Sequence, residues 1–277
     1  MKPTDLALTV MVMVLWGLNF VVAKVGLEEL PPMLLVGLRF ALVAALLLGF
    51  VPIPRGHLLK ILGLSISMGA LHFGLMFVGI RSVDASVASV AIQLQVPFAA
   101  LLAWLFLGDR LGWHRFAGMA LAFIGILIIA GEPRMATRLV PLGCIVTASL
   151  LWAIGNVQLR DLRAVSPMTL NAWLALFAAP QMLIASALFE HGQWDAMTSA
   201  GWKGWGAIVY MIVFVTIIGY GFWYRMAQLY PVNQTMAHTL QVPVWGVLCS
   251  VALLGERLTW AMIAGSLLTL AGVAIIV

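Results

Sequence analysis

The chain has 277 residues, of which 63% are hydrophobic and only 9% are charged, and its formal net charge is +5. Soluble domains are about 45–50% apolar and about 25% charged, so this composition excludes a soluble enzyme, a secreted disulfide scaffold and a disordered chain. A basic excess beside long apolar stretches is typical of the loops of membrane proteins. We therefore expect a lipid bilayer, and no nucleic acid, as the partner of this chain.

Apolar stretches follow one another along the whole chain, separated by short breaks that carry most of the charge and several prolines. A spanning helix needs roughly 20 residues, so ten spans use about 200 and leave no room for a catalytic domain outside the bilayer. The predicted spans are 6–24, 33–51, 58–80, 85–107, 113–130, 139–159, 167–189, 203–224, 233–254 and 260–277. The predicted fold class is an all-α integral membrane protein with ten transmembrane helices.

The first apolar stretch follows a short polar segment that resembles a signal peptide. It continues to about Ala23 with no cleavage site of small residues, so we expect a retained first span. Lys and Arg are slightly more numerous in the breaks that share a side with the amino terminus. This bias predicts a multi-pass protein of the cell (inner) membrane with both termini in the cytoplasm.

An internal repeat divides the chain. Residues 94–97, Leu-Gln-Val-Pro, recur at 240–243, and the Leu-Gly-Asp-Arg-Leu of 107–111 recurs as Leu-Gly-Glu-Arg-Leu at 254–258. The repeats are 1–138 and 139–277, with five predicted spans each. Because five is odd, the second repeat crosses the membrane in the opposite sense, and inverted repeats around a central site are typical of secondary transporters.

The duplicated Leu-Gly-Asp/Glu-Arg-Leu element, each copy followed by a glycine-punctuated final span, resembles the drug/metabolite transporter superfamily. The opening Leu-Trp-Gly-Leu-Asn-Phe of 15–20 is similar to the first span of that family, and the resemblance covers the whole chain. More narrowly, the chain resembles the ten-helix, two-repeat members, which include bacterial amino-acid exporters.

The resemblance implies cytoplasmic termini, a central cavity, and alternating-access export of small organic solutes, with amino acids (aromatic ones included) or related metabolites as the expected cargo. Multidrug efflux is the alternative. Small multidrug members carry a carboxylate inside their first span, whereas residues 6–24 contain none.

Nothing in the sequence predicts an enzyme. No Gly-Lys pair exists for a phosphate-binding loop, and all ten carboxylates lie in loops, tails or span edges. We expect no cofactor and no metal site, and Cys144 and Cys249 lie in apolar stretches as packing residues. Lys24 and Arg39 lie near span ends, where long cationic side chains can snorkel to the interface.

Several polar and aromatic residues at span depth are candidates for the substrate path. His72 shares a helical face with Met76 and three small residues. The alternative for the histidine is a hydrogen bond to a neighbouring helix. The alternative for the methionine is ordinary core packing. The full set of predicted substrate-binding residues is Trp16, Asn19, His72, Met76, Gln95, Trp152, Asn156, Tyr220, His238 and Gln241.

Trp16 with Asn19, and Trp152 with Asn156, pair an indole with an amide on one helical face in the first span of each repeat. Such a pair can hold a planar ligand, or it can join two helices. Tyr220 lies deep enough in its span to face a cavity.

Gln95 and Gln241 each stand two residues before a proline, at Pro97 and Pro243. A proline inside a helix removes a backbone hydrogen bond and kinks the axis, so we expect a hinge in each half, with static kinks as the alternative. The glycines of each final span suit close helix packing, and because the duplication supplies both halves, we expect a functional monomer.

Overall fold

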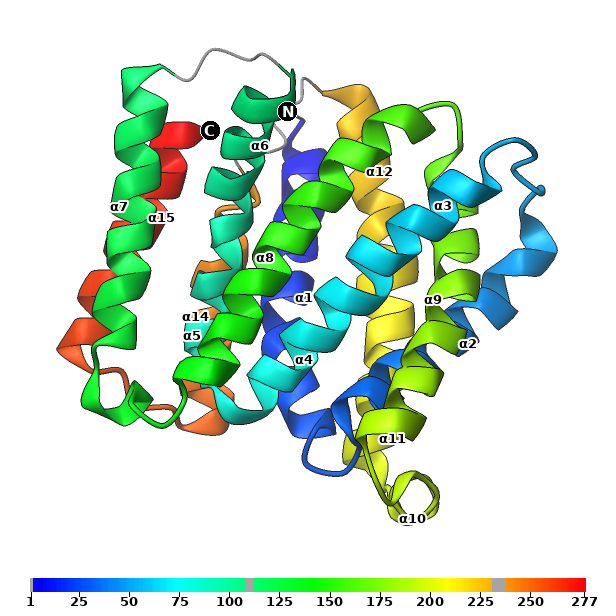
Figure 1. Ribbon diagram of the computed structural model, residues 1–277. Helices are drawn as coiled ribbons and strands as arrows, with labels where there is room; N and C mark the ends of the chain where they lie inside the picture. The colour runs from blue at the N-terminus through cyan, green and yellow to red at the C-terminus, as the bar shows by residue number, and fades with distance from the viewer. Residues whose placement is uncertain (1, 108–111, 231–237) are drawn as a thin grey trace.

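The computed structural model describes residues 2–107, 112–230 and 238–277, and in these ranges the chain folds into helices without a strand. The helices run alongside one another as a bundle, and both termini lie at one end of it (Figure 1). We call this the terminal end and the other the opposite end. The all-helical architecture predicted from composition is confirmed.

Five stretches of the first half cross the bundle, and three of them change helix type along their length. Their elements are α1 (Pro3–Gly26), α2 (Pro32–Leu47) with η1 (Leu48–Phe50), α3 (Leu58–Leu64) with η2 (Ser65–His72) and α4 (Phe73–Ser82), α5 (Ala85–Ala91) with η3 (Ile92–Leu94) and α6 (Gln95–Leu107), and α7 (Trp113–Ala130). Here η2 is a π-helix, whereas η1 and η3 are 3₁₀ turns.

The second half follows the same plan after a short linking turn. Its elements are η4 (Pro133–Met135), α8 (Leu139–Gln158) with η5 (Leu159–Leu162), α9 (Pro167–Phe189), α10 (Gln193–Ser199), α11 (Trp202–Tyr210) with the π-helix η6 (Met211–Tyr220) and α12 (Gly221–Leu229), α14 (Gln241–Leu254) and α15 (Trp260–Ile276). The short α10 projects from the opposite end (Figure 1).

Eight continuous helices in the described residues are long and apolar enough to cross a membrane. They correspond to the first eight predicted spans. The last two stretches form shorter apolar helices, α14 and α15, of 14 and 17 residues. The structure thus describes a multi-spanning membrane protein.

Local sequence signals explain where the helices begin and end. Pro3, Pro32 and Pro167 occupy the first turns of α1, α2 and α9, where the missing N–H costs nothing. The Thr259 hydroxyl accepts a hydrogen bond from the Met262 N–H and caps α15. Gly255 ends α14 with a φ of +65°, a conformation that favours glycine.

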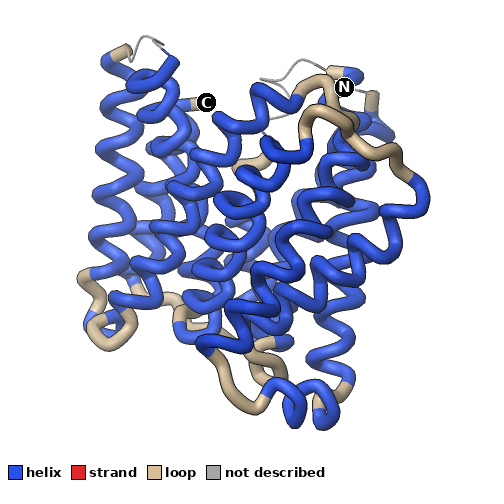
Figure 2. The backbone as a smooth tube through the Cα atoms, turned by 45° about the vertical axis from the view of Figure 1, so that its right-hand side comes forward, coloured by secondary structure: helices blue, strands red, loops and turns tan. Residues whose placement is uncertain are grey.

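The final helices of the two halves, α7 and α15, lie side by side at one edge of the bundle (Figure 1, and in the turned view of Figure 2), and they touch through glycines. A Cβ on Gly118 would lie 2.6 Å from the carbonyl oxygen of Gly272, and one on Gly265 would lie 2.5 Å from that of Gly125. The lower-numbered glycine of α7 meets the higher-numbered glycine of α15, so the helices are antiparallel. Their backbones are in direct contact, with no space for a side chain.

Helices α2 and α9, the second of each half, also pack antiparallel. The Glu190 carboxylate, just beyond the end of α9, accepts hydrogen bonds from the Met33 and Leu34 N–H groups at 2.7 and 3.0 Å. At the other end, the Trp173 indole donates to the Pro52 carbonyl at 3.2 Å. The acidic cap satisfies the free amides of α2 and complements its dipole.

The two halves are joined at the opposite end by polar contacts. Glu256, from the duplicated motif, accepts hydrogen bonds from the Ala85 N–H at 2.7 Å and the Ser86 N–H at 3.0 Å, which caps α5 of the other half. Close by, Arg138 pairs with Asp84 of the same half at 2.8 Å. The glutamate of the motif therefore has a structural role between the halves. Its counterpart in the first half, in residues 108–111, lies outside the described residues.

Candidate functional site

The third crossing of each half contains a π-helical segment, η2 in the first half and η6 in the second. These segments end at His72 and Tyr220, which are both predicted substrate-binding residues. π-Helical stretches are rare and occur frequently at functional sites, because they widen the helix and shift side chains out of register. Both halves thus interrupt a regular helix at corresponding places near the middle of the bundle.

One aromatic group surrounds the end of η2. The His72 ring lies 4.7 Å from Phe73 and 4.8 Å from Trp152 of α8, measured between ring centroids. Phe40 of α2 packs edge-on against Phe73 at 5.5 Å. The structure therefore brings together His72 and Trp152, two of the predicted residues, from different halves of the chain.

A second aromatic group surrounds the end of η6. The Trp16 ring of α1 lies 5.3 Å from Tyr220 and 5.5 Å from Trp223 of α12. Trp16 also donates through its indole N–H to the Val215 carbonyl of η6 at 3.4 Å. The predicted residues Trp16 and Tyr220 are thus in contact, and this group too combines residues of both halves.

Arg39 of α2 lies between these two aromatic groups. Its guanidinium carbon is 5.1 Å from the centroid of the Phe73 ring, and Nη2 is 3.4 Å from the hydroxyl of Thr216 in η6. Only 3% of the residue is exposed. The expectation that Arg39 snorkels to the interface is wrong, because its side chain points into the bundle between the two π-helical segments.

Lys24, unlike Arg39, binds the end of a neighbouring helix. Its ammonium donates to the carbonyls of Ile80, at 3.3 Å, and of Val83, which closes the last turn of α4. A cation at a helix C-terminus satisfies free carbonyls and complements the helix dipole. Lys24 therefore binds helix α1 to α4 near the opposite end.

His72 makes the contact that sequence analysis held as its alternative. Nδ1 lies 2.7 Å from the Ala148 carbonyl of α8 and donates to it, since a carbonyl oxygen only accepts. The residue is 3% exposed. This hydrogen bond fixes the ring against α8 while its face packs on Trp152.

The two repeated glutamines lie at the starts of matching helices. Helix α6 begins at Gln95 after the 3₁₀ turn η3, and α14 begins at Gln241. Gln95 donates to the Gln93 side chain at 3.2 Å, and Gln241 lies 2.9 Å from His238. Each glutamine thus pairs within its own segment, two residues before a proline.

The remaining predicted residues lie in contrasting surroundings. Asn19 is buried, and its Oδ1 has no hydrogen-bond partner. Met76 is buried in the main apolar core, whereas Asn156 is exposed. Asn156 therefore stands apart from the centre described above.

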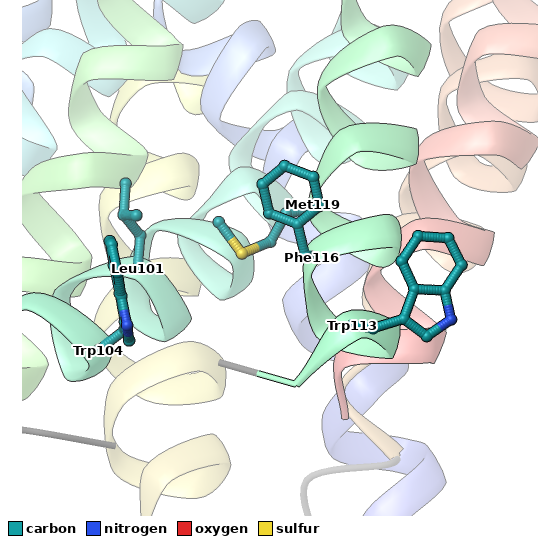
Figure 3. Close-up of a pocket in the computed structure, with 5 residues that line it drawn as sticks. All are labelled: Leu101, Trp104, Trp113, Phe116 and Met119. Atoms are coloured by element: carbon teal, nitrogen blue, oxygen red, sulfur yellow. The ribbon is translucent and has the colours of Figure 1, made fainter. Parts of the chain in front are cut away.

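A groove of about 510 Å³ separates α6 from α7. Figure 3 shows Leu101 and Trp104 on one wall and Phe116 and Met119 on the other, with Trp113 turned outward. Trp104, Trp113 and Phe116 are between 47% and 72% exposed, and none of the described residues that line the groove has a charged or amide side chain. A solute site needs a few convergent polar groups, so this groove is part of the apolar outer surface.

Arg39 was not among the predicted site residues, although the sequence carries a signal for it. Arg39 is the seventh residue of its predicted span, whereas Lys60, Arg115 and Lys203 lie within three residues of a span end. An ionisable residue inside a span is by default a candidate for function. Depth within the span, rather than residue type, distinguishes Arg39 from the other cations.

Comparison with known proteins adds independent observations. The EamA-like transporter family matches this chain twice, over residues 5–131 and 140–277. A "Probable amino-acid metabolite efflux pump" of Salmonella typhimurium is 34% identical, covering 99% of this chain and 95% of the relative. A protein of the same description from Escherichia coli K12 is 33% identical with the same coverage.

Two further likenesses concern the membrane and the fold. An "Uncharacterized inner membrane transporter" of Escherichia coli K12 is 25% identical over 89% of this chain and 81% of the relative. A solved crystal structure with 18% identity superimposes with a TM-score of 0.63, covering 99% of this chain and 96% of the other. That second likeness shows a shared fold.

Proposed function

The chain belongs to the EamA-like transporter family, and from this premise we propose that it exports amino acids or related small metabolites by alternating access. It is a transporter of the inner membrane and not an enzyme. The observation that carries the proposal is that both halves meet at one buried centre, where Arg39 lies between two aromatic groups. The full-length likeness to efflux pumps for amino-acid metabolites supports this class of cargo.

We propose that residues 1–138 and 139–277 are two inverted repeats of five spans. Two pairs of equivalent helices support this. Gly118 and Gly265 are equivalent by the repeat, yet α7 and α15 pack antiparallel, and α2 and α9, which both begin at a proline, do the same. Equivalent helices that are antiparallel are what a twofold axis in the membrane plane produces.

The proposed orientation places both termini in the cytoplasm. The terminal end is then cytoplasmic, and the contacts of Glu256 and Asp84 close the external side. Alternating access requires these contacts to break when the cavity opens outward. A single chain contains both halves of the site, so we propose that the monomer is the functional unit.

We further propose that the predicted residues line the path of the solute. Trp16, His72, Trp152 and Tyr220 supply aromatic surface at the centre. Asn19, Met76, Gln95, Asn156, His238 and Gln241 complete the proposed set. Helices α6 and α14 both begin at the matching glutamines, which supports Pro97 and Pro243 as paired hinges.

Counterflow in proteoliposomes tests the function. Vesicles loaded with one unlabelled amino acid should accumulate the same labelled amino acid, and an imposed pH gradient reports whether protons are coupled. Accumulation of a defined class of amino acids is the expected result. No counterflow of any amino acid, together with resistance of an overexpressing strain to cationic drugs, would contradict the proposal and favour multidrug efflux.

A further inference from the structure

The guanidinium of Arg39 is buried without a partner for most of its donors. A guanidinium carries five N–H donors in a planar fork. Its Nε and Nη1 atoms have no hydrogen-bond partner, and the Thr216 hydroxyl is 3.4 Å from Nη2. Among the described residues, buried side-chain N and O atoms without a partner occur only in Arg39 and Asn19.

The charge of Arg39 also has no counter-ion in the described part of the chain. The ion pairs found there join Lys60 to Asp161, Arg134 and Arg138 to Asp84, and Lys203 to Glu28. None involves Arg39, and the carboxylates of the sequence all lie at span ends or in loops. An unpaired buried charge is strongly unfavourable, so an anion from outside the chain would relieve it.

The fold itself does not require a cation at this position. By the internal repeat, which matches Pro32 with Pro167, Arg39 corresponds to Leu174 of α9. Leu174 is buried as an ordinary member of the apolar core. Helices α2 and α9 thus pack alike, but α2 carries a buried charge at the position where α9 carries Leu174.

The surroundings of Arg39 suit a small organic anion better than a structural ion pair. The Phe73 and Phe40 rings lie 5.1 and 5.8 Å from the guanidinium carbon and supply apolar surface on that side. A guanidinium has two edges that bind a carboxylate through two parallel hydrogen bonds, the side edge with Nε and Nη2 and the end edge with Nη1 and Nη2. On each edge of Arg39 one nitrogen has no partner, and the shared Nη2 has only the 3.4 Å contact with Thr216. Thr216 of η6 and Phe73, the residue directly after η2, both contact the guanidinium.

Asn19 offers the opposite polarity at a similar depth. Its unpartnered Oδ1 is a hydrogen-bond acceptor. Asn19 lies seven residues before the end of α1 at Gly26, and Arg39 lies seven residues after the start of α2 at Pro32. Both are therefore about 10 Å from the same end of the bundle at ~1.5 Å per residue. The chain thus has unpaired donors for a carboxylate and an unpaired acceptor for an ammonium group at similar depth.

We propose that Arg39 binds the carboxylate of the transported solute, and that the cargo is an α-amino acid whose side chain packs against the aromatic groups of the centre. This assignment rests on the proposed export of amino acids and names the group of the cargo that the protein recognises. A neutral amide or a decarboxylated amine of the same cargo would leave the Arg39 charge unpaired and would bind poorly.

Ligand binding to the purified full chain tests this assignment. The twenty amino acids are first screened for thermal stabilisation and counterflow, starting with phenylalanine because the centre is aromatic. The strongest responder is then compared with its amide and its decarboxylated amine. The proteins are the wild type, Arg39→Leu, Arg39→Lys and, as a control, Arg115→Leu, which changes an exposed arginine of α7.

The assignment predicts that wild type and Arg115→Leu bind the amino acid at least tenfold more tightly than its amide. It also predicts that Arg39→Leu loses this preference and that Arg39→Lys keeps part of it. If Arg39→Leu does not fold, the assignment is still tested by comparing the binding of acid and amide to the wild type and to Arg39→Lys. Equal binding of acid and amide to the wild type would overturn the assignment and leave the export function standing.

Two other results separate the remaining possibilities. If the wild type neither binds nor exchanges any amino acid but carries another solute, the proposed cargo class fails, and the role of Arg39 in recognising amino acids fails with it. Measurements in chloride and in sulfate identify a simple inorganic counter-ion. Stabilisation by chloride that depends on Arg39 and is unaffected by amino acids would also overturn the assignment.

Discussion

The crossing of α7 with α15 and the centre around Arg39 use opposite kinds of packing within one helical bundle. At the crossing, glycines allow two backbones to touch, with Gly265 and Gly125 too close to admit a methyl group. At the centre, helices change to π-helical geometry and a buried charge keeps unpaired donors. The crossing is optimised for stability, and the centre retains an unfavourable feature that binding of a ligand would relieve.

The largest expected loss of stability is at the crossing of α7 with α15. Gly265→Ala places a Cβ 2.5 Å from the Gly125 carbonyl oxygen, and because that neighbour is backbone, the helices must separate. Overpacking of this kind costs about 1–3 kcal/mol. We expect a lower melting temperature in detergent. The control is Gly143→Ala in α8, where no atom lies within 4 Å of the added Cβ, and equal melting temperatures for the two variants would contradict the close contact.

A smaller loss of stability is expected at the end where the halves are joined. Glu256→Ala removes the acceptor for the Ala85 and Ser86 amides and uncaps α5. Loss of a helix cap costs about 0.5–2 kcal/mol. Glu256→Gln, which keeps one acceptor oxygen, should lose less. Melting curves of the three proteins test this, and an unchanged curve for Glu256→Ala would show that the cap contributes nothing to stability.

Substitutions at the proposed hinges should change the rate of solute exchange and leave the melting temperature nearly constant. Pro97→Ala or Pro243→Ala restores a backbone donor and stiffens the start of α6 or α14. We expect folded protein with slower counterflow and unchanged affinity for the solute. Gln95→Ala and Gln241→Ala are the comparison, with weaker binding expected. Normal exchange rates in both proline variants would contradict the hinges and leave the two prolines as static features of packing.

Much of this architecture follows from the sequence because it depends on composition and repetition. Runs such as residues 139–159 need lipid around them, and the recurrence of Leu-Gln-Val-Pro at 94–97 and 240–243 marks equivalent helices. The meeting of Trp16 with Tyr220, and of His72 with Trp152, combines residues far apart in the chain. Periodicity identified each residue as a candidate, but it does not say which helices are neighbours.

Arg39 was grouped with the cations near span ends, which commonly snorkel, although it is the seventh residue of its predicted span. Its depth was visible in the sequence, but which face of α2 is turned inward was not. The π-helical segments η2 and η6 also have no sequence signature of their own, since they differ from α-helix in one hydrogen-bond register. Both features depend on tertiary packing between the halves.

The central claim is that the buried charge of Arg39 serves the cargo and not the fold. The most direct measurement is the melting temperature of ligand-free Arg39→Leu, which installs the residue found at the equivalent Leu174, together with its amino-acid counterflow. We predict a higher melting temperature than that of the wild type, because an unpaired buried charge is removed, and loss of counterflow. A lower melting temperature with counterflow retained would show that Arg39 is a structural residue and would contradict the account.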